Sequence, residues 1–305
     1  MNLVDGNYLN QYVAPKLLED FRNYKNDFIG VIPRAPQEAL TADGIKFNKL
    51  INNVGFLINN VDPFAATVMA GKKGIIEWDK LDTTPTKVTD AEIRYLPFDK
   101  RSTVRVKHTE SWIVGYRDYV LNKIAPYEAA TGMIVLRTTG AADANGRKRL
   151  TYNDLIDFES QINLLNLMNP DKLFLTLCSQ HQNDLKLDKA GTQNNRDFIR
   201  MDKDSGAITG FLKLKIFENN AAPIYTAAGV LKAQGAAPAV GDQAASVFFY
   251  GDSMVQHVES VKILYKPETI DTTNADPTSE FRLQSYALCE KTQDYGFGAL
   301  ISENA

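Results

Sequence analysis

The sequence predicts an α+β fold, and three observations lead to that prediction. A capping residue at position 151 precedes apolar positions at helical spacing, which predicts a helix over 152–168. An uninterrupted apolar run over 173–177 predicts a central strand. The C-terminal quarter adds strand-like runs at 246–250, 258–266 and 281–291, followed by a small apolar tail at 295–301. Helices and distant strands therefore share one unit whose sheet is completed by the C-terminal region.

The first third of the chain is predicted to be extended. Residues 1–42 carry scattered aromatic side chains but little core of their own, and Pro33 and Pro36 force an extended exit. We expect this arm to be ordered by docking on something else. Residues 43–107 predict a polar ribbon with a turn at 71–74 and strands at 75–78, 93–96 and 103–106. Such a ribbon is marginal alone in water, so it is either a solvated hairpin or lies across a neighbouring subunit.

The middle of the chain alternates between helices and strands. A helix is predicted over 109–125, with Thr109 as its N-cap and Pro126 ending it. Further predictions are a strand at 133–136, a loop at 139–149, a short helix from 179 to about 187 and a strand at 211–217. In the last strand, Leu212, Leu214 and Ile216 are expected on one face. The basic end of the loop, 147–149, is expected to be solvated or to contact a helix terminus.

The composition limits the classes of function. With 305 residues, 44% hydrophobic and 23% charged, the chain is an ordinary globular protein. The net charge of −3 argues against a protein that coats nucleic acid, although a shell enclosing a genome remains compatible. The amino terminus does not resemble a secretory signal, and no apolar run approaches the roughly 20 residues of a membrane span. Cys178 and Cys289 are expected to be buried reduced thiols, which indicates a reducing cytoplasm.

No pattern of catalytic or ligand-binding residues stands out. His108, His181 and His257 lie far apart and lack metal-ligand spacing, so each is expected to be a surface or hydrogen-bonded histidine. Gly251-Asp252 reads as a turn rather than a catalytic carboxylate. Nucleophile-elbow, zinc-protease and phosphate-loop motifs are not found. We therefore expect no enzyme activity, no catalytic residue, no cofactor and no metal.

Three blocks in sequence order resemble the major capsid proteins of tailed double-stranded DNA bacteriophages, which have the Hong-Kong-97-type fold. The blocks are a ribbon end running into a helix (96–125), a helix, strand and polar helix (155–187), and the closing strands (246–301). The resemblance implies a definite partition of the chain. It comprises an N-terminal arm (1–42), an extended E-loop ribbon (43–107), the spine helix of the P-domain (108–126), the A-domain (127–243), the P-domain ribbon and loop (244–284) and a return strand to the A-domain (285–305).

The same resemblance implies self-assembly into hexamers and pentamers of an icosahedral shell around viral DNA, without sequence-specific DNA binding or membrane contact. It implies portal, scaffold or decoration proteins as further partners, and a virion capsid assembled in the host cytoplasm. Charged residues near the ribbon are the candidate subunit contacts: Lys72, Lys73, Arg94, Lys100 and Arg101. Lys72 or Lys73 could also supply the lysine of a covalent crosslink, but no partner asparagine is identified.

Three alternatives remain open at this point. An encapsulin-like nanocompartment shell shares the fold. A double jelly-roll coat protein would need many regularly spaced strands, which the two helices at 109–125 and 152–168 oppose. An enzyme is the third alternative, and a monomer that turned over small substrates would support it.

Overall fold

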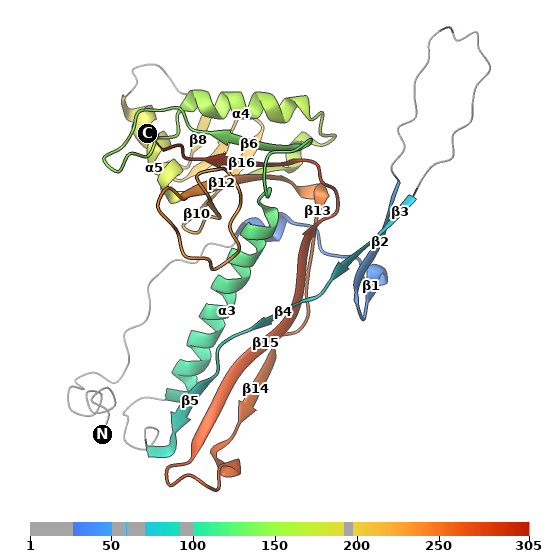
Figure 1. Ribbon diagram of the computed structural model, residues 1–305, viewed down its shortest axis with the longest axis vertical. Coiled ribbons are helices and arrows are strands. Elements are labelled where there is room, and N and C mark those ends of the chain that lie inside the picture. The colour runs from blue at the N-terminus through green and yellow to red at the C-terminus, as the bar shows by residue number, and fades with distance from the viewer. Residues whose placement is uncertain (1–26, 51–58, 60–70, 92–99, 192–197, 305) are drawn as a thin grey trace.

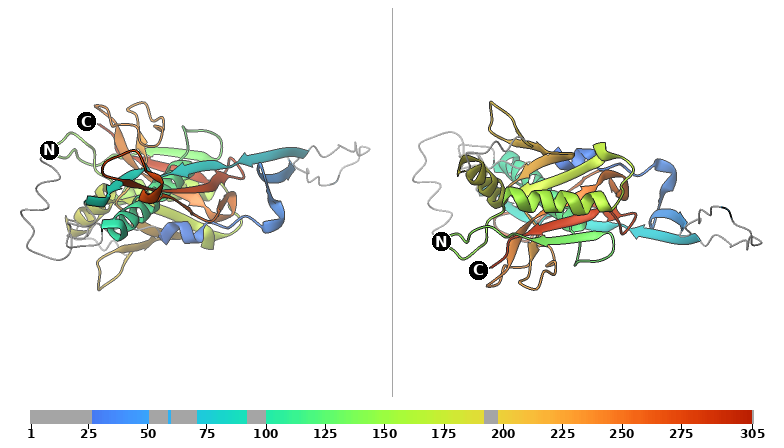
Figure 2. Two further views of the ribbon diagram at one scale, coloured as in Figure 1. Left: turned by 90° about the horizontal axis from the view of Figure 1, so that it is seen from below. Right: turned by 90° about the horizontal axis from the view of Figure 1, so that it is seen from above.

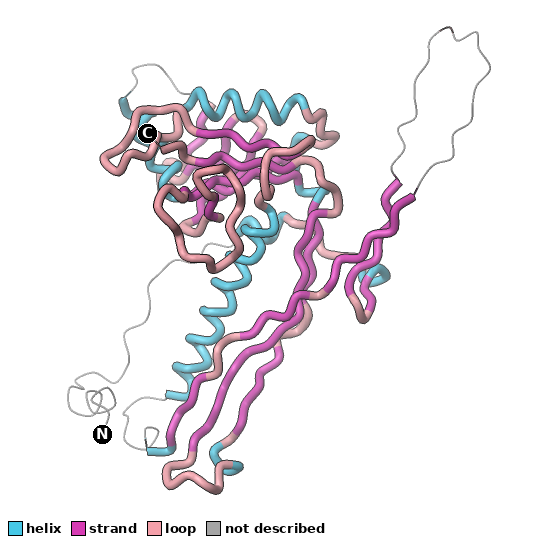
Figure 3. The backbone as a smooth tube through the Cα atoms, viewed as in Figure 1, coloured by secondary structure: helices cyan, strands magenta, loops and turns pink. Residues whose placement is uncertain are grey.

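The computed structural model describes residues 27–50, 59, 71–91, 100–191 and 198–304. An α/β body lies at one end, a long strip of strands beside a helix extends from it, and a narrow ribbon projects sideways (Figures 1 and 3). The predicted α+β class is confirmed. Among the described residues, no helix is both long and apolar enough to cross a membrane.

The body is built on an eight-stranded mixed sheet with the order β6-β16-β12-β7-β10-β9-β8, in which β11 pairs with β12. Its strands are β6 (Met133–Arg137), β7 (Leu173–Cys178), β8 (Ile199–Met201), β9 (Ile208–Phe211), β10 (Leu214–Asn219), β11 (Ile224–Tyr225), β12 (Gln243–Tyr250) and β16 (Phe297–Ile301). The predicted central strand is confirmed, because every residue of β7 is buried and β7 lies between β12 and β10. Strands covered on both faces favour such continuous apolar sequences.

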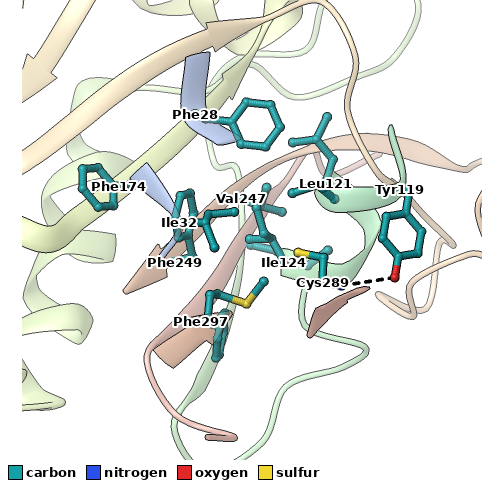
Figure 4. Packing of buried hydrophobic residues seen from close by; sticks show 14 of the residues in the cluster. Phe28, Ile32, Tyr119, Leu121, Ile124, Phe174, Val247, Phe249, Cys289 and Phe297 are labelled. Atoms are coloured by element: carbon teal, nitrogen blue, oxygen red, sulfur yellow. Dashed lines mark hydrogen bonds between the residues drawn. The ribbon is translucent and has the colours of Figure 1, made fainter. Parts of the chain in front are cut away.

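Two cores lie on opposite faces of this sheet. Alternate residues of β12 separate them: Phe248 packs with Leu155 and Phe158 of α4 (Tyr152–Leu164), whereas Val247 and Phe249 pack toward α3 (Lys100–Ile124). The third helix, α5 (Ser179–Gly191), begins directly after β7. Figure 4 shows the α3-side core, where residues from distant parts of the chain converge. The sheet thus joins both helical layers into one body.

The start of α4 has the predicted cap in full. The Thr151 hydroxyl accepts from the Asp154 backbone N–H at 3.2 Å, and the Asp154 carboxylate accepts from the Thr151 N–H at 2.8 Å. The same carboxylate also accepts from the Thr139 hydroxyl at 2.6 Å. Asp154 therefore fixes the helix start and ties the preceding loop to it. The helix ends at Leu164, four residues earlier than predicted.

The strip below the body is organised around one long strand, β15 (Thr278–Lys291). On one side it pairs with β13 (Met254–Val258) and β14 (Lys262–Lys266), and on the other with β4 (Asp79–Asp82) and β5 (Thr86–Thr89). The single strand predicted at 258–266 is therefore divided, with residues 259–261 between its two halves. Alternate residues of β15 are buried, and α3 packs along this strip.

The long helix α3 corrects two predictions. It begins at Lys100, so the predicted strand at 103–106 is helical and the ribbon ends before 107. Thr109 is not an N-cap, since its hydroxyl donates to the Arg105 carbonyl within the helix. The β-branched residues that suggested a strand are overridden by tertiary contacts, including the packing of His108 against Phe281.

The projecting ribbon is a three-stranded antiparallel sheet of β1 (Leu40–Thr41), β2 (Gly44–Leu50) and β3 (Gly71–Glu77). The predicted turn at 71–74 is wrong, because these residues pair with β2 inside β3. Figure 2 shows the ribbon pointing away from the body, both from below and from above. Gly44 is required at its base: its φ is +143°, and a Cβ there would lie 1.9 Å from the Ile76 carbonyl oxygen.

We call residues 27–36 the N-terminal segment. This segment packs on the subunit's own body. Phe28 and Ile32 are 1% and 2% exposed and belong to the α3-side core. The predicted docking on something else is therefore wrong for this part of the arm. Residues 1–26 lie outside the described part of the chain.

One predicted strand and one boundary of the sequence-based partition differ from the structure. Leu212 has a φ of +47° and turns the chain between β9 and β10, so the predicted strand at 211–217 is a hairpin. β12 belongs to the body sheet, so the chain leaves the body after Tyr250 rather than at residue 244. Hydrophobic alternation does not distinguish a strand from a hairpin that turns in its middle.

Candidate subunit-contact surfaces

The predicted contact residues fall in three different places. Lys72 and Lys73 lie in β3, where their backbones pair with Lys49 and Asn48, and their side chains are outside the described part. Arg94 also lies outside it. Lys100 and Arg101 form the first turn of α3, at the far end of the strip from the body (Figure 1). The four of them that lie in the described part do not form one site, because Lys72 and Lys73 are on the ribbon and Lys100 and Arg101 are at the start of α3.

Arg101 makes an ion pair within its own subunit. Its Nη2 atom lies 2.5 Å from Oε1 of Glu268, in the loop that links β14 to β15. This hydrogen bond raises the pKa of Arg101, while the backbone N–H of Glu268 and then Arg101 lower the pKa of Glu268. Arg101 therefore ties the start of α3 to this tip loop (residues 267–277). A contact of Arg101 with a neighbouring subunit would be additional to this role.

An apolar face of β14 remains uncovered beside the helix. Ile263 and Tyr265 pair with Leu283 and Phe281 of β15, and directly opposed residues of an antiparallel pair lie on one face of the sheet. Leu283 and Phe281 are buried, whereas Ile263 is 63% exposed and Tyr265 is 43% exposed. In the tip loop, Ile270 is also 63% exposed. Contiguous exposed apolar side chains at a sheet edge are typical of protein contact surfaces.

The base of the ribbon is held by a charged cluster. The Tyr119 hydroxyl donates to Asp79 at 2.6 Å and accepts from the Cys289 backbone N–H at 3.3 Å. Lys123 lies 3.4 Å from Asp79 and 2.8 Å from Glu290. Burial, and then the Asp79 hydrogen bond, raise the pKa of Tyr119 well above its usual range. These contacts connect α3, β15 and the start of β4, where the chain leaves the ribbon.

A small apolar cluster lies on the other side of the ribbon base. Ile45 and Ile76 pack with Ala35, Val255 and Leu288. In addition, the Trp78 indole donates to the Thr41 carbonyl at 3.1 Å, and its ring packs edge-on against His257 at 5.6 Å. Among its described residues, the ribbon contacts the rest of the subunit at its root, and farther out β2 and β3 pair with each other.

Two of the three histidines have structural hydrogen-bond partners. His181 is fully buried, with its two ring nitrogens 2.7 Å and 2.9 Å from the hydroxyls of Ser246 and Ser302. His108 lies between the hydroxyls of Thr83 and Thr86, and burial lowers its pKa. Cys178 and Cys289 are free and buried, as predicted. Within the described ranges, no three histidine, cysteine or acidic side chains form a metal-binding group.

The basic run at 147–149 corrects another prediction. Arg147 is buried rather than solvated, and its guanidinium binds Asp184 through Nη1 at 2.7 Å and Nη2 at 2.8 Å. Asp143 accepts from Nε at 3.1 Å, and Ser302 accepts from Nη1 at 3.2 Å. The pair joins the 139–149 loop to α5. Nothing in the local sequence pattern identifies Asp184, which lies 37 residues away.

Sequence reasoning also missed Gln256, which connects the N-terminal segment to the strip. It lies in β13 with 7% exposure, and its backbone bridges the segment at Arg34. A glutamine that directly follows two apolar residues in a strand is the one sequence signal that could have identified it.

Comparisons with known proteins identify the fold. No protein-family model and no curated protein matches the sequence. Among solved structures, the capsid of the cyanophage P-SCSP1u is similar, with a TM-score of 0.66 and 14% identity over 96% of this chain and 93% of that chain. A capsid chain of an empty GTA particle has a TM-score of 0.63 and 11% identity, covering 97% of both chains.

A chain of Mycobacterium phage Che8 is similar too, with a TM-score of 0.61 and 11% identity over 95% of both chains. The chain therefore shares, over nearly its whole length, the fold of these phage and particle capsid proteins. The resemblance noted in the sequence is confirmed at the level of the fold.

Proposed function

We propose that this chain is a major capsid protein of a tailed double-stranded DNA bacteriophage. Its copies form hexamers and pentamers that close into an icosahedral shell around the genome. The role is structural, with no catalytic step and no cofactor. The supporting observation is a capsid fold over the whole chain combined with a ribbon that leaves the body.

The parts of the subunit have separate roles in this proposal. The β2–β3 ribbon is the E-loop that lies over a neighbour. Its described residues contact their own subunit at the root, and a narrow ribbon of this kind is marginal alone in water. The strip of β15 and α3 is the P-domain along the subunit edge, and the β14 face and tip loop lie on that edge. The eight-stranded body is the A-domain near the capsomer axis. Closed symmetry then multiplies many modest contacts into a stable shell.

Further partners follow from the same role. Portal, scaffold or decoration proteins would bind the shell, DNA would be enclosed without sequence-specific contacts, and assembly would take place in the host cytoplasm. Lys72, Lys73, Arg94 and Lys100 remain proposed contact residues, while Arg101 would act through the tip loop.

Removing the projecting part of the ribbon tests the proposal. Lys46 pairs with Ile75, so replacing residues 47–74 by a two-residue Asn-Gly turn closes the hairpin in register and retains the anchored root. We expect the shortened protein to keep the circular dichroism spectrum of the body, but to form no closed particles in negative-stain electron microscopy. The full chain, expressed in parallel, should form closed shells or capsomers.

Two outcomes would contradict the proposal. A full-length chain that stays monomeric at high concentration would contradict the assembly function, and a shortened chain that closes normal shells would contradict the role of the ribbon. An encapsulin-like shell would also close, so the neighbouring genes distinguish it. Portal and terminase genes support a phage, whereas an enzyme gene encoding a short targeting tail supports a nanocompartment.

A further inference from the structure

We propose that Gln256 is the positioning residue that clamps the N-terminal segment to the subunit, and thereby fixes where the segment lies on the strip. The clamp uses both the side chain and the backbone of this one residue. Its consequence for assembly rests on the proposed capsid function, whereas the clamp itself does not.

The side-chain amide of Gln256 makes three hydrogen bonds in a buried position. Its Nε2 donates to the carbonyls of Ile29 at 2.7 Å and Ile32 at 3.1 Å. Its Oε1 accepts from the Tyr116 hydroxyl of α3 at 2.9 Å. The two carbonyls only accept hydrogen bonds, so they require Nε2 on the side of the segment, and Oε1 is left to accept from the Tyr116 hydroxyl.

The backbone of Gln256 holds the next residues of the segment. Its N–H donates to the Pro33 carbonyl at 3.0 Å, and its carbonyl accepts from the Ala35 N–H at 2.9 Å. These bonds form a short parallel bridge centred on Arg34. The segment is therefore held over residues 29–35 by a residue more than 220 positions away in sequence.

Side-chain packing and hydrogen bonds both act along this stretch. A hollow of about 570 Å³ lies beside the clamp, lined by residues 29–34, Tyr116 and residues 256–258. Phe28 and Ile32 anchor the segment in the core, and Ile29 and Val31 pack against that core. The hydrogen bonds to Gln256 add the polar contacts that fix the backbone beside the hollow.

The chemistry of the clamp predicts an order among substitutions. Gln256→Met keeps the length and flexibility of the side chain but removes the donor, so the two segment carbonyls lose their partner. Gln256→Glu places a carboxylate against the same two carbonyl oxygens and should release the segment further. Tyr116→Phe removes only the hydrogen bond to Oε1 and should have the smallest, though still measurable, effect.

Trypsin cleavage of the Arg34–Ala35 bond measures release of the segment. Arg34 is exposed, but its neighbours on both sides are bonded to Gln256, so cleavage requires the segment to open. Losing the two Nε2 bonds should accelerate cleavage roughly 10- to 100-fold in Gln256→Met. Intact-mass spectrometry would follow the fragment that begins at Ala35. Circular dichroism should show that the rest of the fold is unchanged.

Gln234→Met is the matched control. Gln234 is an exposed glutamine whose Nε2 donates to the Gly115 carbonyl at 3.2 Å, so it offers the same chemical change away from the segment. Its cleavage rate should equal that of the wild type. If Gln256→Met and Gln256→Glu are also cleaved at the wild-type rate, the clamp is overturned. Should both fail to fold, an unchanged rate in Tyr116→Phe would overturn it.

Particle formation separates the clamp from the capsid function. Wild-type protein that forms shells, beside clamp variants that form few or misshapen ones, supports the role of the clamp in assembly. Clamp variants with a released segment but normal shells overturn that role. Wild-type protein that never forms shells argues against the capsid function, while the trypsin comparison still decides whether the clamp exists.

Discussion

Breaking the buried ion pair between Arg147 and Asp184 should destabilise the body strongly. The Arg147 and Asp184 side chains are 10% and 3% exposed, and the Asp184 carboxylate also accepts from the Leu150 N–H at 3.0 Å. In Asp184→Asn, one oxygen becomes an NH₂ group that faces other donors. The charge of Arg147 then stays buried, with Asp143 as its remaining acidic partner. The expected result is a large loss of stability.

The magnitude follows from the behaviour of buried ion pairs. Removing one partner of such a pair costs about 3–5 kcal/mol, because the other charge is left uncompensated. For a unit of 150–250 residues this corresponds to a fall in melting temperature of roughly 6–20 °C. Thermal unfolding of the unassembled protein, followed by far-UV circular dichroism, would measure it.

An exposed ion pair in the same body provides the control. Lys172 lies 2.5 Å from Asp252, and both side chains are well exposed. Asp252→Asn should leave the melting temperature close to the wild-type value, because water screens such pairs. If Asp184→Asn has no larger effect than Asp252→Asn, the reasoning about burial is wrong.

A double variant tests the physical cause. Arg147→Met/Asp184→Asn removes the buried charge, while the asparagine oxygen can still accept from the Leu150 N–H. Replacing a buried pair by uncharged groups is often close to neutral, so the double variant should recover more than half of the lost stability. A double variant less stable than Asp184→Asn would refute this explanation.

Two further predictions concern the tip loop. Charge reversal in Arg101→Glu should release the loop from α3 and speed amide exchange in residues 267–277, and Arg101→Glu/Glu268→Arg should restore protection. An unchanged exchange rate in the single variant would argue against the tether. Asp271 accepts hydrogen bonds from Asn274 and Thr278, which lower its pKa to about 2. Because the folded-state pKa is below the usual value of 3.8, the contribution of Asp271 is present above about pH 4 and is lost as the pH falls toward 2. Nuclear magnetic resonance titration of the loop amides should show this transition in wild type and not in Asp271→Asn, while Asp157→Asn on α4 should leave it in place.

Local signals in the sequence account for part of the fold. Thr151 and Asp154 form a capping box because that motif is complete within four residues. The apolar run 173–178 becomes the central strand because only a strand covered on both faces buries every side chain. The closing strands at 246–250 and 281–291 were also predictable from their residue patterns.

The candidate contact surfaces were less predictable. Charge alone singled out Arg101, but its ion pair with Glu268 depends on the tip loop lying beside the start of α3. The apolar residues of β14 were visible in the sequence. Ile263 stays exposed while Leu283 beside it is buried. This difference depends on how far α3 covers that face of the sheet.

The sequence by itself determined the α+β class, the capped helix, the buried central strand and the resemblance to capsid proteins, because these depend on periodicity and local hydrogen bonds. The tertiary structure decided that α3 begins at Lys100, that Arg147 is buried against Asp184, and that Gln256 holds the N-terminal segment. In each of these cases the partner is distant in sequence. The packing of the chain then decides which polar groups become partners, and no local sequence pattern encodes that choice.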